Sequence, residues 1–416
     1  MKHLKQANLL LLFAMIPATV FAQSAEWSQW RGPNRDGRGT AASLPQSWPK
    51  TLKEQWKVTV GVGHASPVVS DGKIYVFTRQ GEEEVLLSLD AVTGKQIWKS
   101  GNPIAYEMHS AAAGHGKGPK STPVVSNGNV YTFGITGVLS AHDARTGELK
   151  WRRDFASNFP VTSPLYGTAM SPLVEDGLLI VHVGGPDKGA LRAFELARGA
   201  IKWSNNTDGP AYASPIVATL AGVRQVVSFM QKDLVGIDVT NGKMLWRVPA
   251  KSGYDTNSVT PLIYKDMIIV AREDQGLTAF RLVKRGADLA PEEVWSNKQV
   301  ELYMNTPVIE GNQLTGLSVR NKGQFFSIDA DTGKTLWLGA GRMGENAAIV
   351  NAGGKVLLML TNDANLIVHP INAKNYAPAA KYTVAASQTW AHPLLFGKQI
   401  LIKDESTLAS FALVEK

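Results

Sequence analysis

Cysteine is absent from the 416-residue chain, and its absence excludes several kinds of protein. Without cysteine there can be no disulfide framework, no thiolate metal site and no cysteine nucleophile. A lipoprotein anchor also needs an acylated cysteine near the mature N-terminus, so we expect no lipid anchor. Any chemistry of this protein must therefore depend on other side chains.

Concentrated charge is also missing, although the formal net charge is +8. The basic residues are scattered, and their densest cluster is the pair Arg152-Arg153. Nucleic-acid binding needs a concentrated basic stripe or a known module, so we expect no nucleic-acid partner. The histidine spacings of zinc sites, a phosphate-binding loop and the Gly-x-Ser-x-Gly motif are absent as well. We therefore expect no metal site, and the sequence identifies no catalytic residue.

Long apolar runs are scarce, and the one at the N-terminus has the pattern of a secretory signal. Lys2 and Lys5 precede a largely apolar stretch that ends before Ala22. The stretch is shorter than the ~20 residues of a membrane-spanning helix. We therefore expect residues 1–22 to be a signal peptide cleaved after Ala22, with cleavage after Ala25 as the alternative. The mature protein is expected to be periplasmic or secreted, with no membrane span.

What the sequence does contain is one unit repeated eight times. Most copies begin with Ser/Thr-Pro and aliphatic residues, continue through polar turns and apolar strands, and end on Thr-Gly followed by Trp. The seventh and eighth copies begin more weakly, at Ala347-Ala348 and His392-Pro393. The first copy runs from Ser66 to Trp98, and the second runs from Thr122 to Trp151. A period of roughly 41–56 residues is typical of propeller blades. The pattern predicts an all-β fold, an eight-bladed β-propeller of four-stranded antiparallel blades.

The last copy indicates how the ring closes. It starts at His392 and is too short for four strands, whereas residues 54–60 form an extra strand with its own tryptophan. We predict that this N-terminal strand completes the last blade and closes the ring, which removes both open sheet edges. A large flat ring at one place in each copy should fasten each blade to the next. The tryptophans expected to dock blades are Trp56, Trp98, Trp151, Trp203, Trp246, Trp295 and Trp337, with Tyr382 as a substitute in the seventh copy.

The chain is thus expected to comprise a signal peptide (1–22), an irregular leader segment (23–53) and a single propeller (54–416). Glycines and a proline in the leader prevent a regular helix, while its tryptophans need burial. We expect the leader to lie across the propeller as a clamp or plug. A partner-binding role for the leader is the alternative.

The signature Asp/Asn-x-x-Thr/Asn-Gly-x-x-x-Trp resembles the repeats of pyrroloquinoline-quinone-type (PQQ-type) β-propellers. It stands at Asp90–Trp98, Asp143–Trp151, Asp238–Trp246 and Asp329–Trp337, while the third, fifth and seventh copies depart from it. The resemblance implies two functional classes. One is the quinoprotein dehydrogenases, which bind the quinone and calcium over the ring centre. The other is noncatalytic and includes the propeller subunit of the outer-membrane barrel-assembly machinery.

The leader carries a second resemblance. Its segment from Trp27 to Gly37 looks like the Trp-x-x-Trp-Arg-Gly-Pro-x-x-Asp-Gly opening of a group of exported single-domain propellers. The biochemistry of that group is largely undefined. This resemblance therefore implies export and a propeller, and no particular reaction.

Candidate site residues follow from the register of the repeat. The residue three before each Ser/Thr-Pro proline should lie at one mouth of the central channel, and these residues differ from copy to copy. A ligand pocket needs convergent, different groups. The loop 101–121 is the longest between copies and is the candidate flap over this mouth. The residues predicted to form the binding face are His64, His109, His115, Lys120, Tyr212, Asn257, Asn305, Arg342, Glu345 and Trp390; Ala169, Ser258 and Met304 complete the rim.

We favour a noncatalytic exported scaffold that binds a protein or peptide partner on this inter-blade loop face. The alternative is a periplasmic PQQ-dependent oxidoreductase acting on an alcohol or sugar, with PQQ and calcium as its cofactors. The favoured interpretation needs no cofactor. The rim contains no compact acidic cluster for calcium, and the adjacent-cysteine disulfide of many quinoproteins is absent.

Overall fold

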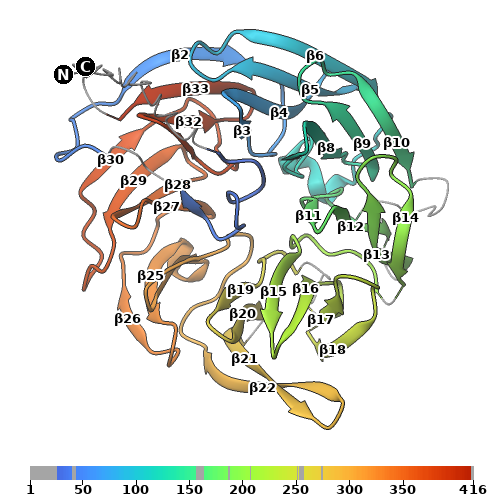
Figure 1. The fold of residues 1–416 in the computed structure, drawn as a ribbon. Coiled ribbons are helices and arrows are strands. Elements are labelled where there is room, and N and C mark those ends of the chain that lie inside the picture. Colours follow the sequence, from blue (N-terminus) through green and yellow to red (C-terminus); the bar gives the residue numbers. More distant parts are fainter. Residues whose placement is uncertain are drawn as a thin grey trace, which may run out of the picture.

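The computed structural model describes residues 26–39, 44–155, 164–185, 188–206, 208–250, 252, 257–272 and 275–413. Eight sheets are arranged radially around a central axis, each built from four antiparallel strands (Figure 1). The predicted eight-bladed β-propeller is therefore confirmed. The expected signal peptide and its cleavage after Ala22 lie outside the described residues. No helix in the described part of the chain is long and apolar enough to cross a membrane.

Blades 1 to 4 each run from a short inner strand at the axis to an outer strand at the rim. Blade 1 contains β3 (Val68–Ser70), β4 (Lys73–Gln80), β5 (Glu83–Asp90) and β6 (Gln96–Pro103). Blade 2 contains β7 (Val124–Ser126), β8 (Asn129–Phe133), β9 (Val138–Asp143) and β10 (Leu149–Asp154). Blade 3 contains β11 (Leu173–Glu175), β12 (Leu178–Gly185), β13 (Lys188–Glu195) and β14 (Ile201–Asn205). Blade 4 contains β15 (Ile216–Leu220), β16 (Val223–Phe229), β17 (Asp233–Asp238) and β18 (Met244–Pro249).

Blades 5 to 8 follow the same order, with an added strand in blade 7. Blade 5 contains β19 (Leu262–Tyr264), β20 (Met267–Arg272), β21 (Gly276–Arg285) and β22 (Asp288–Asn297). Blade 6 contains β23 (Val308–Glu310), β24 (Gln313–Ser318), β25 (Gln324–Asp329) and β26 (Thr335–Leu338). Blade 7 contains β27 (Ala347–Ala352), β28 (Val356–Thr361), β29 (Asn365–Pro370) and β30 (Ala380–Thr383), and β1 (Arg38–Gly39) joins it in parallel to β27. Blade 8 contains β31 (Leu394–Phe396), β32 (Gln399–Lys403), β33 (Thr407–Ala412) and β2 (Lys53–Thr59).

Blade 8 closes the ring with strands from the two ends of the propeller. Its outer strand β2 pairs antiparallel with β33, so a blue and a red strand lie side by side in Figure 1. The predicted closure by an N-terminal strand is therefore confirmed. Two short 3-10 helices interrupt the described loops, η1 (Ser110–His115) between blades 1 and 2 and η2 (Arg320–Lys322) within blade 6. The core consists of apolar side chains packed between neighbouring sheets, as around Trp151.

The contact between neighbouring blades explains why the repeat couples a Thr-Gly turn to a tryptophan. Trp98 of blade 1 is buried, its Nε1 donates to the carbonyl of Ala144 in blade 2, and its ring covers Gly147 of the blade 2 turn. Gly147 has a φ of +77°, and a Cβ there would lie 2.5 Å from Trp98 Cε3. The turn thus needs glycine twice, for its backbone conformation and for the space under the ring. The same pairs recur as Trp56 with Gly94, Trp151 with Gly199, Trp203 with Gly242, and Trp295 with Gly333.

Blade 4 departs from this arrangement. The hydrogen-bond partner of Trp246 is Gln225 of its own blade, and blade 5 has no Thr-Gly turn before Trp295. Blade 5 instead carries the long hairpin of β21 and β22, which protrudes at the bottom of Figure 1. Phe280 and Leu282 of this hairpin pack in the apolar cluster of Trp246. The insertion therefore replaces the missing turn as the cover of blade 4.

Candidate functional site

The leader segment lies along the channel between the blades. Trp27 is buried and forms a β-bridge with Val69 of blade 1, while β1 pairs with β27 of blade 7. Arg31 is completely buried and donates to the carbonyls of Thr306 and Pro307 in blade 6. Leader residues thus contact blades on both sides of the ring, so the leader crosses the channel.

A second leader arginine holds the opposite side of the ring. Arg35 donates to the carbonyls of Ser171 and Pro172 in blade 3, at 3.1 and 2.8 Å. The guanidinium carbons of Arg31 and Arg35 each lie 5.5 Å from the ring centre of Trp30. The two cations therefore fix the indole of Trp30 at the mouth of the channel.

Hydroxyl groups of successive blades form a chain of hydrogen bonds around the axis. In each bond the backbone N–H of the residue before the repeat proline in one blade, which is Ser or Thr except for His392 in blade 8, donates to the hydroxyl oxygen of the equivalent residue in the next. The bonds are Ser66 N to Thr122 Oγ1 (3.0 Å), Thr122 N to Ser171 Oγ (3.0 Å), Ser171 N to Ser214 Oγ (2.9 Å), Ser214 N to Thr260 Oγ1 (3.0 Å), Thr260 N to Thr306 Oγ1 (3.2 Å) and His392 N to Ser66 Oγ (2.9 Å). This is the physical role of Ser/Thr at the start of each copy. Blade 7 has Ala347 and Ala348 at this place and cannot accept such a bond, and blade 7 is where β1 joins the ring.

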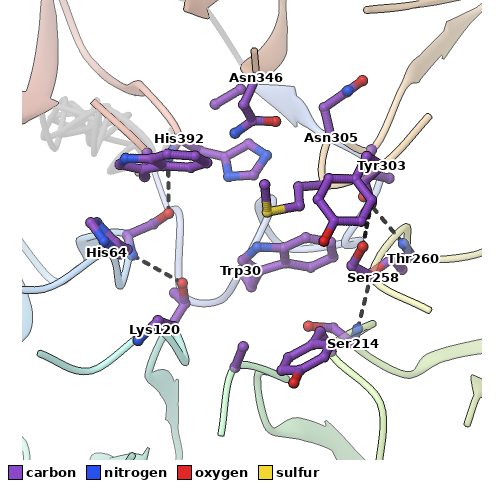
Figure 2. A pocket seen from close by; sticks show the side chains of 18 of the residues that line it. Trp30, His64, Lys120, Ser214, Ser258, Thr260, Tyr303, Asn305, Asn346 and His392 are labelled. Atoms are coloured by element: carbon purple, nitrogen blue, oxygen red, sulfur yellow. Dashed lines mark hydrogen bonds between the residues drawn. The ribbon is translucent and has the colours of Figure 1, made fainter. Parts of the chain in front are cut away.

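A pocket of about 180 Å³ opens above this chain of hydroxyls, at the face where the loops enter the inner strands. Trp30 lies in its centre, with Lys120 and His64 on one side and Asn346 and Asn305 on the other (Figure 2). Its lining comes from all eight blades and the leader. The remaining lining residues are Ser66, His115, Thr122, Tyr166, Ala169, Tyr212, Ser214, Ser258, Thr260, Tyr303, Met304, Thr306, Ala347, Ala348, Trp390 and His392.

Aromatic rings form a continuous wall on the side of blades 8 and 1 to 4. The Trp390 ring centre lies 5.6 Å from His64 and 5.5 Å from His115. His115 lies 5.2 Å from Tyr166, and Tyr166 lies 5.7 Å from Tyr212. Most of these contacts are edge-to-face, the geometry that aromatic pairs prefer. The wall gives the pocket an apolar, ordered side.

One ammonium group borders this wall. The described acceptor of Lys120 Nζ is the carbonyl of Gly116, at 3.3 Å. Burial lowers the pKa of Lys120 to about 8, and the nearby Glu84 opposes this effect. Burial raises the pKa of Glu84 to about 7, although its carboxyl accepts a hydrogen bond from Ile135 N at 2.7 Å. At neutral pH the described pocket lining therefore carries one ammonium group and no carboxylate.

Two buried amide side chains across the pocket have atoms without partners. Asn305 Nδ2 and Asn346 Oδ1 have no hydrogen-bond partner among the described residues, and both residues are more than nine-tenths buried. The Oδ1 of Asn305 accepts from Leu317 N at 3.2 Å, which orients this amide. An unsatisfied buried donor or acceptor costs about 1–3 kcal/mol. A ligand that pairs with these two atoms would recover that cost.

Comparison with known proteins places this architecture in a family. A family profile described as "Outer membrane protein assembly factor BamB" matches residues 82–338. The chain belongs to this family. The BamB protein of Yersinia pestis is 23% identical over 372 residues, which cover 84% of this chain and 86% of that protein. The crystal structure of BamB from Moraxella catarrhalis superposes with a TM-score of 0.63 at 13% identity, over 87% of this chain and 98% of that one.

Quinoproteins are related as well. The dehydrogenase subunit of a quinone-dependent alcohol dehydrogenase from Acetobacter aceti is 25% identical over 312 residues. The match covers 65% of this chain but 39% of that protein. The structure of the quinohemoprotein alcohol dehydrogenase from Comamonas testosteroni superposes with a TM-score of 0.67 at 14% identity, over 94% of this chain and 81% of that one. The BamB family and these enzymes thus share the propeller.

The pocket of this BamB-family chain does not fit a calcium-bound quinone. Calcium takes six to eight oxygen ligands and prefers carboxylates, yet the described lining contains no Asp or Glu. Glu345, the acidic residue of the predicted set, is exposed and lies outside the pocket. Within the described residues no group of three or more His, Asp or Glu side chains could hold a metal ion. The described residues of this pocket therefore do not form a site for a calcium-bound quinone.

The structure brings together part of the predicted binding face. Six of its residues line the pocket: His64, His115, Lys120, Tyr212, Asn305 and Trp390. The other four lie outside it. His109 caps η1 by accepting from Ala111 N, Asn257 is buried and donates to backbone carbonyls including that of Met230, and Arg342 and Glu345 are exposed.

The residues that sequence reasoning did not assign are those whose position depends on another segment. Trp30 comes from the leader, and His392 packs edge-on against it with ring centres 5.7 Å apart. For His392 a signal existed, because it stands directly before Pro393 where other copies have Ser or Thr. For Trp30 the repeat offered none.

Buried histidines predict that the fold weakens in mild acid. Burial lowers the pKa of His64 and His392 to about 3 and of His182 to about 4. The folded state then binds fewer protons than the unfolded state below about pH 6.5, so stability is lost as the pH falls. The raised pKa of Glu84 acts in the opposite direction between about pH 7 and 4.5. We expect the free energy of unfolding to fall by about 2 kcal/mol between pH 6.5 and 5.5, since each of these groups contributes at most ~1.4 kcal/mol per pH unit and Glu84 offsets part of the loss.

Denaturant titrations at both pH values measure this loss, and His182→Gln isolates one contribution. His182 is 3% exposed, and its Nε2 lies 2.8 Å from the carbonyl of Asp208. Glutamine retains a donor but does not titrate. The variant should lose less stability over this interval than the wild type, and equal losses would contradict the assignment.

Proposed function

We propose that this protein is an exported, noncatalytic scaffold of the cell envelope that binds a segment of a protein or peptide in its axial pocket. One observation carries the proposal. Positions that the repeat makes equivalent differ in every blade, and those of seven blades converge on one pocket, whose lining contains buried polar atoms without partners among the described residues. A purely structural ring would favour equivalent residues at equivalent positions.

The relatives support the same class of function. Those named outer membrane protein assembly factors align over 80–84% of this chain, in Yersinia, Moranella and Burkholderia. By analogy, we place the protein in the periplasm of a Gram-negative cell, with a partner among envelope proteins. The quinone-dependent enzyme from Acetobacter aceti supports the alternative function less well, because the described pocket lining lacks the carboxylates that calcium prefers.

Affinity capture from an envelope extract tests the proposal. The pocket variant changes His64, Lys120, Tyr212 and Trp390 together to alanine, and mass spectrometry identifies the proteins retained with each bait. We expect at least one partner to be reduced by about tenfold or more, because several buried contacts are lost together. The matched control changes His109, Lys117, Arg342 and Glu345 to alanine, which are residues near the same face that do not line the pocket. It should retain the partner.

An identical partner profile for both variants would overturn the proposal, provided that both variants melt like the wild type. A second arm adds PQQ with calcium and follows thermal unfolding. We expect no stabilisation, whereas a ligand at a hundredfold excess over its Kd would add ~2.7 kcal/mol. A clear shift would favour the oxidoreductase.

A further inference from the structure

We infer that the pocket recognises the C-terminal end of a peptide chain, with the terminal carboxylate at Lys120 and an apolar or aromatic last side chain against the ring wall. This inference rests on the proposed function and names the ligand of that same pocket. Four features of the described residues support it.

The first feature is an excess of hydrogen-bond donors around a single cation. Lys120 Nζ has one long bond to a carbonyl, at 3.3 Å, and the described lining contains no carboxylate. An ammonium group has three N–H donors, so Lys120 has donors that this one bond does not use. One cation suits a single negative charge. A phosphate, with up to two charges, typically recruits arginine or several cations, and no arginine lines the described pocket.

The second feature is the hydroxyl chain beneath. Ser66 and Thr122 both line the pocket, and the oxygen of each accepts a backbone N–H from the preceding blade. A hydroxyl that accepts in this way keeps its own proton for donation. The hydroxyl of Tyr212 is in the same situation, because it accepts from Tyr166 N at 3.2 Å. The lining beside Lys120 therefore offers O–H donors to an oxygen anion.

The third feature distinguishes a peptide from a free acid. Asn305 Nδ2 is an unpartnered donor and Asn346 Oδ1 an unpartnered acceptor among the described residues, both on the far side of the pocket from Lys120 (Figure 2). A peptide unit presents one C=O and one N–H, which matches this pair. The two atoms have almost no exposed surface as they stand, so the amides must turn toward the pocket to bind the peptide unit. A small carboxylic acid that reaches Lys120 has no such unit to present.

The fourth feature is size and wall chemistry. A cavity of ~150 Å³ lined by apolar residues accepts benzene, and this pocket measures about 180 Å³. Its volume suits one side chain and a carboxylate rather than a folded element. Trp30, Tyr303 and Trp390 supply ring surfaces, and Met304 supplies an adaptable thioether. An apolar or aromatic last residue is therefore favoured over a charged one.

The experiment compares a fluorescein-labelled hexapeptide, Gly-Ser-Gly-Ser-Ala-Phe, as its free acid and as its C-terminal amide. Fluorescence anisotropy measures both dissociation constants with the full mature chain. Amidation removes the charge and leaves the side chain and the peptide units unchanged. We expect the acid to bind at least about tenfold more tightly, because only its carboxylate forms charge-assisted hydrogen bonds with Lys120. Competition with unlabelled 3-phenylpropionate, which has the ring and carboxylate without a peptide unit, should need at least about tenfold higher concentrations.

Variants at three positions assign the roles. Lys120→Met should abolish the difference between acid and amide, with Lys120→Gln as a second variant should the first not fold. Lys117→Met is the matched control, because Lys117 is exposed in the same loop and does not line the pocket. It should preserve the difference. Asn305→Ala should weaken the acid and the amide equally, because its amide is assigned to the peptide unit.

Equal affinities for acid and amide, or no binding of the acid, would overturn this inference. Phenylpropionate that competes as well as the peptide acid would also overturn it, because the pocket would then recognise a free acid. The proposed function fails separately, if the envelope partner binds the pocket variant as well as it binds the wild type. If the partner needs the pocket but the two hexapeptides bind equally, the proposed function stands. The inference that the pocket recognises a terminal carboxylate would then be wrong.

Discussion

Replacing Gly147 by alanine is expected to lower the free energy of unfolding by about 2–5 kcal/mol. The residue has a φ of +77°, and the left-handed region costs an L-residue about 1–2 kcal/mol. The new Cβ would also lie 2.5 Å from Trp98 Cε3, and the indole would have to move in a close-packed contact between blades. Overpacking of this kind costs about 1–3 kcal/mol more.

Gly128→Ala is the matched control for this prediction. Gly128 lies in the same blade with a φ of +70°, but no atom lies within 4 Å of a Cβ built there. It should cost only the backbone contribution of about 1–2 kcal/mol. Guanidinium titrations of both variants give the comparison. Equal losses of stability would show that the Trp98 ring moves aside freely, so that contact with this ring does not require glycine at position 147.

Removing the closing strand is expected to have a larger effect still. Deletion of residues 54–60 takes away nearly all of β2, its pairing with β33, and the Trp56 ring that covers Gly94 of blade 1. Loss of a packed tryptophan alone costs about 3–5 kcal/mol. The deletion also exposes β33 as a new sheet edge, which favours aggregation. We expect a loss of more than about 5 kcal/mol and a broad, noncooperative thermal transition.

A deletion of similar kind at the rim is the control. Residues 284–288 form the exposed end of the β21–β22 hairpin, beyond its packed residues Phe280 and Leu282. Removing them should leave the melting temperature within a few degrees of the wild type, because surface changes usually alter stability by less than ~0.5 kcal/mol. If the variant without residues 54–60 melts at the same temperature as this control, the closure argument is contradicted.

The order of blades could be predicted from the sequence because each blade is specified locally. Ser/Thr-Pro, the Asp-x-x-Thr-Gly turn and the tryptophan act within one copy or between adjacent copies. In the turn, Asp143 Oδ1 accepts from Thr146 N at 2.9 Å and from Thr146 Oγ1 at 3.1 Å. Such short-range contacts recur with the repeat, so spacing alone indicated eight blades and the rim positions.

The binding pocket could be predicted only in part, for the same reason. His64, Lys120, Tyr212 and Trp390 stand in repeat register and line the pocket. For residues outside that register, such as Asn257, irregular loops decide where the side chain lies. Its side-chain amide donates to the carbonyls of Met230 and Ala250, so it supports the backbone and does not reach the mouth. Loop direction depends on contacts that no short pattern encodes.

By itself, the sequence determined the propeller, its closure and the places where different side chains meet at one mouth, because these follow from a repeated local code. Only the tertiary structure decided what the pocket contains. Arg31 bonds to carbonyls 275 and 276 residues away and so places Trp30 in the centre of the pocket. A contact of that range has no counterpart in the repeat, because it depends on how the leader crosses a channel that exists only once the ring has closed.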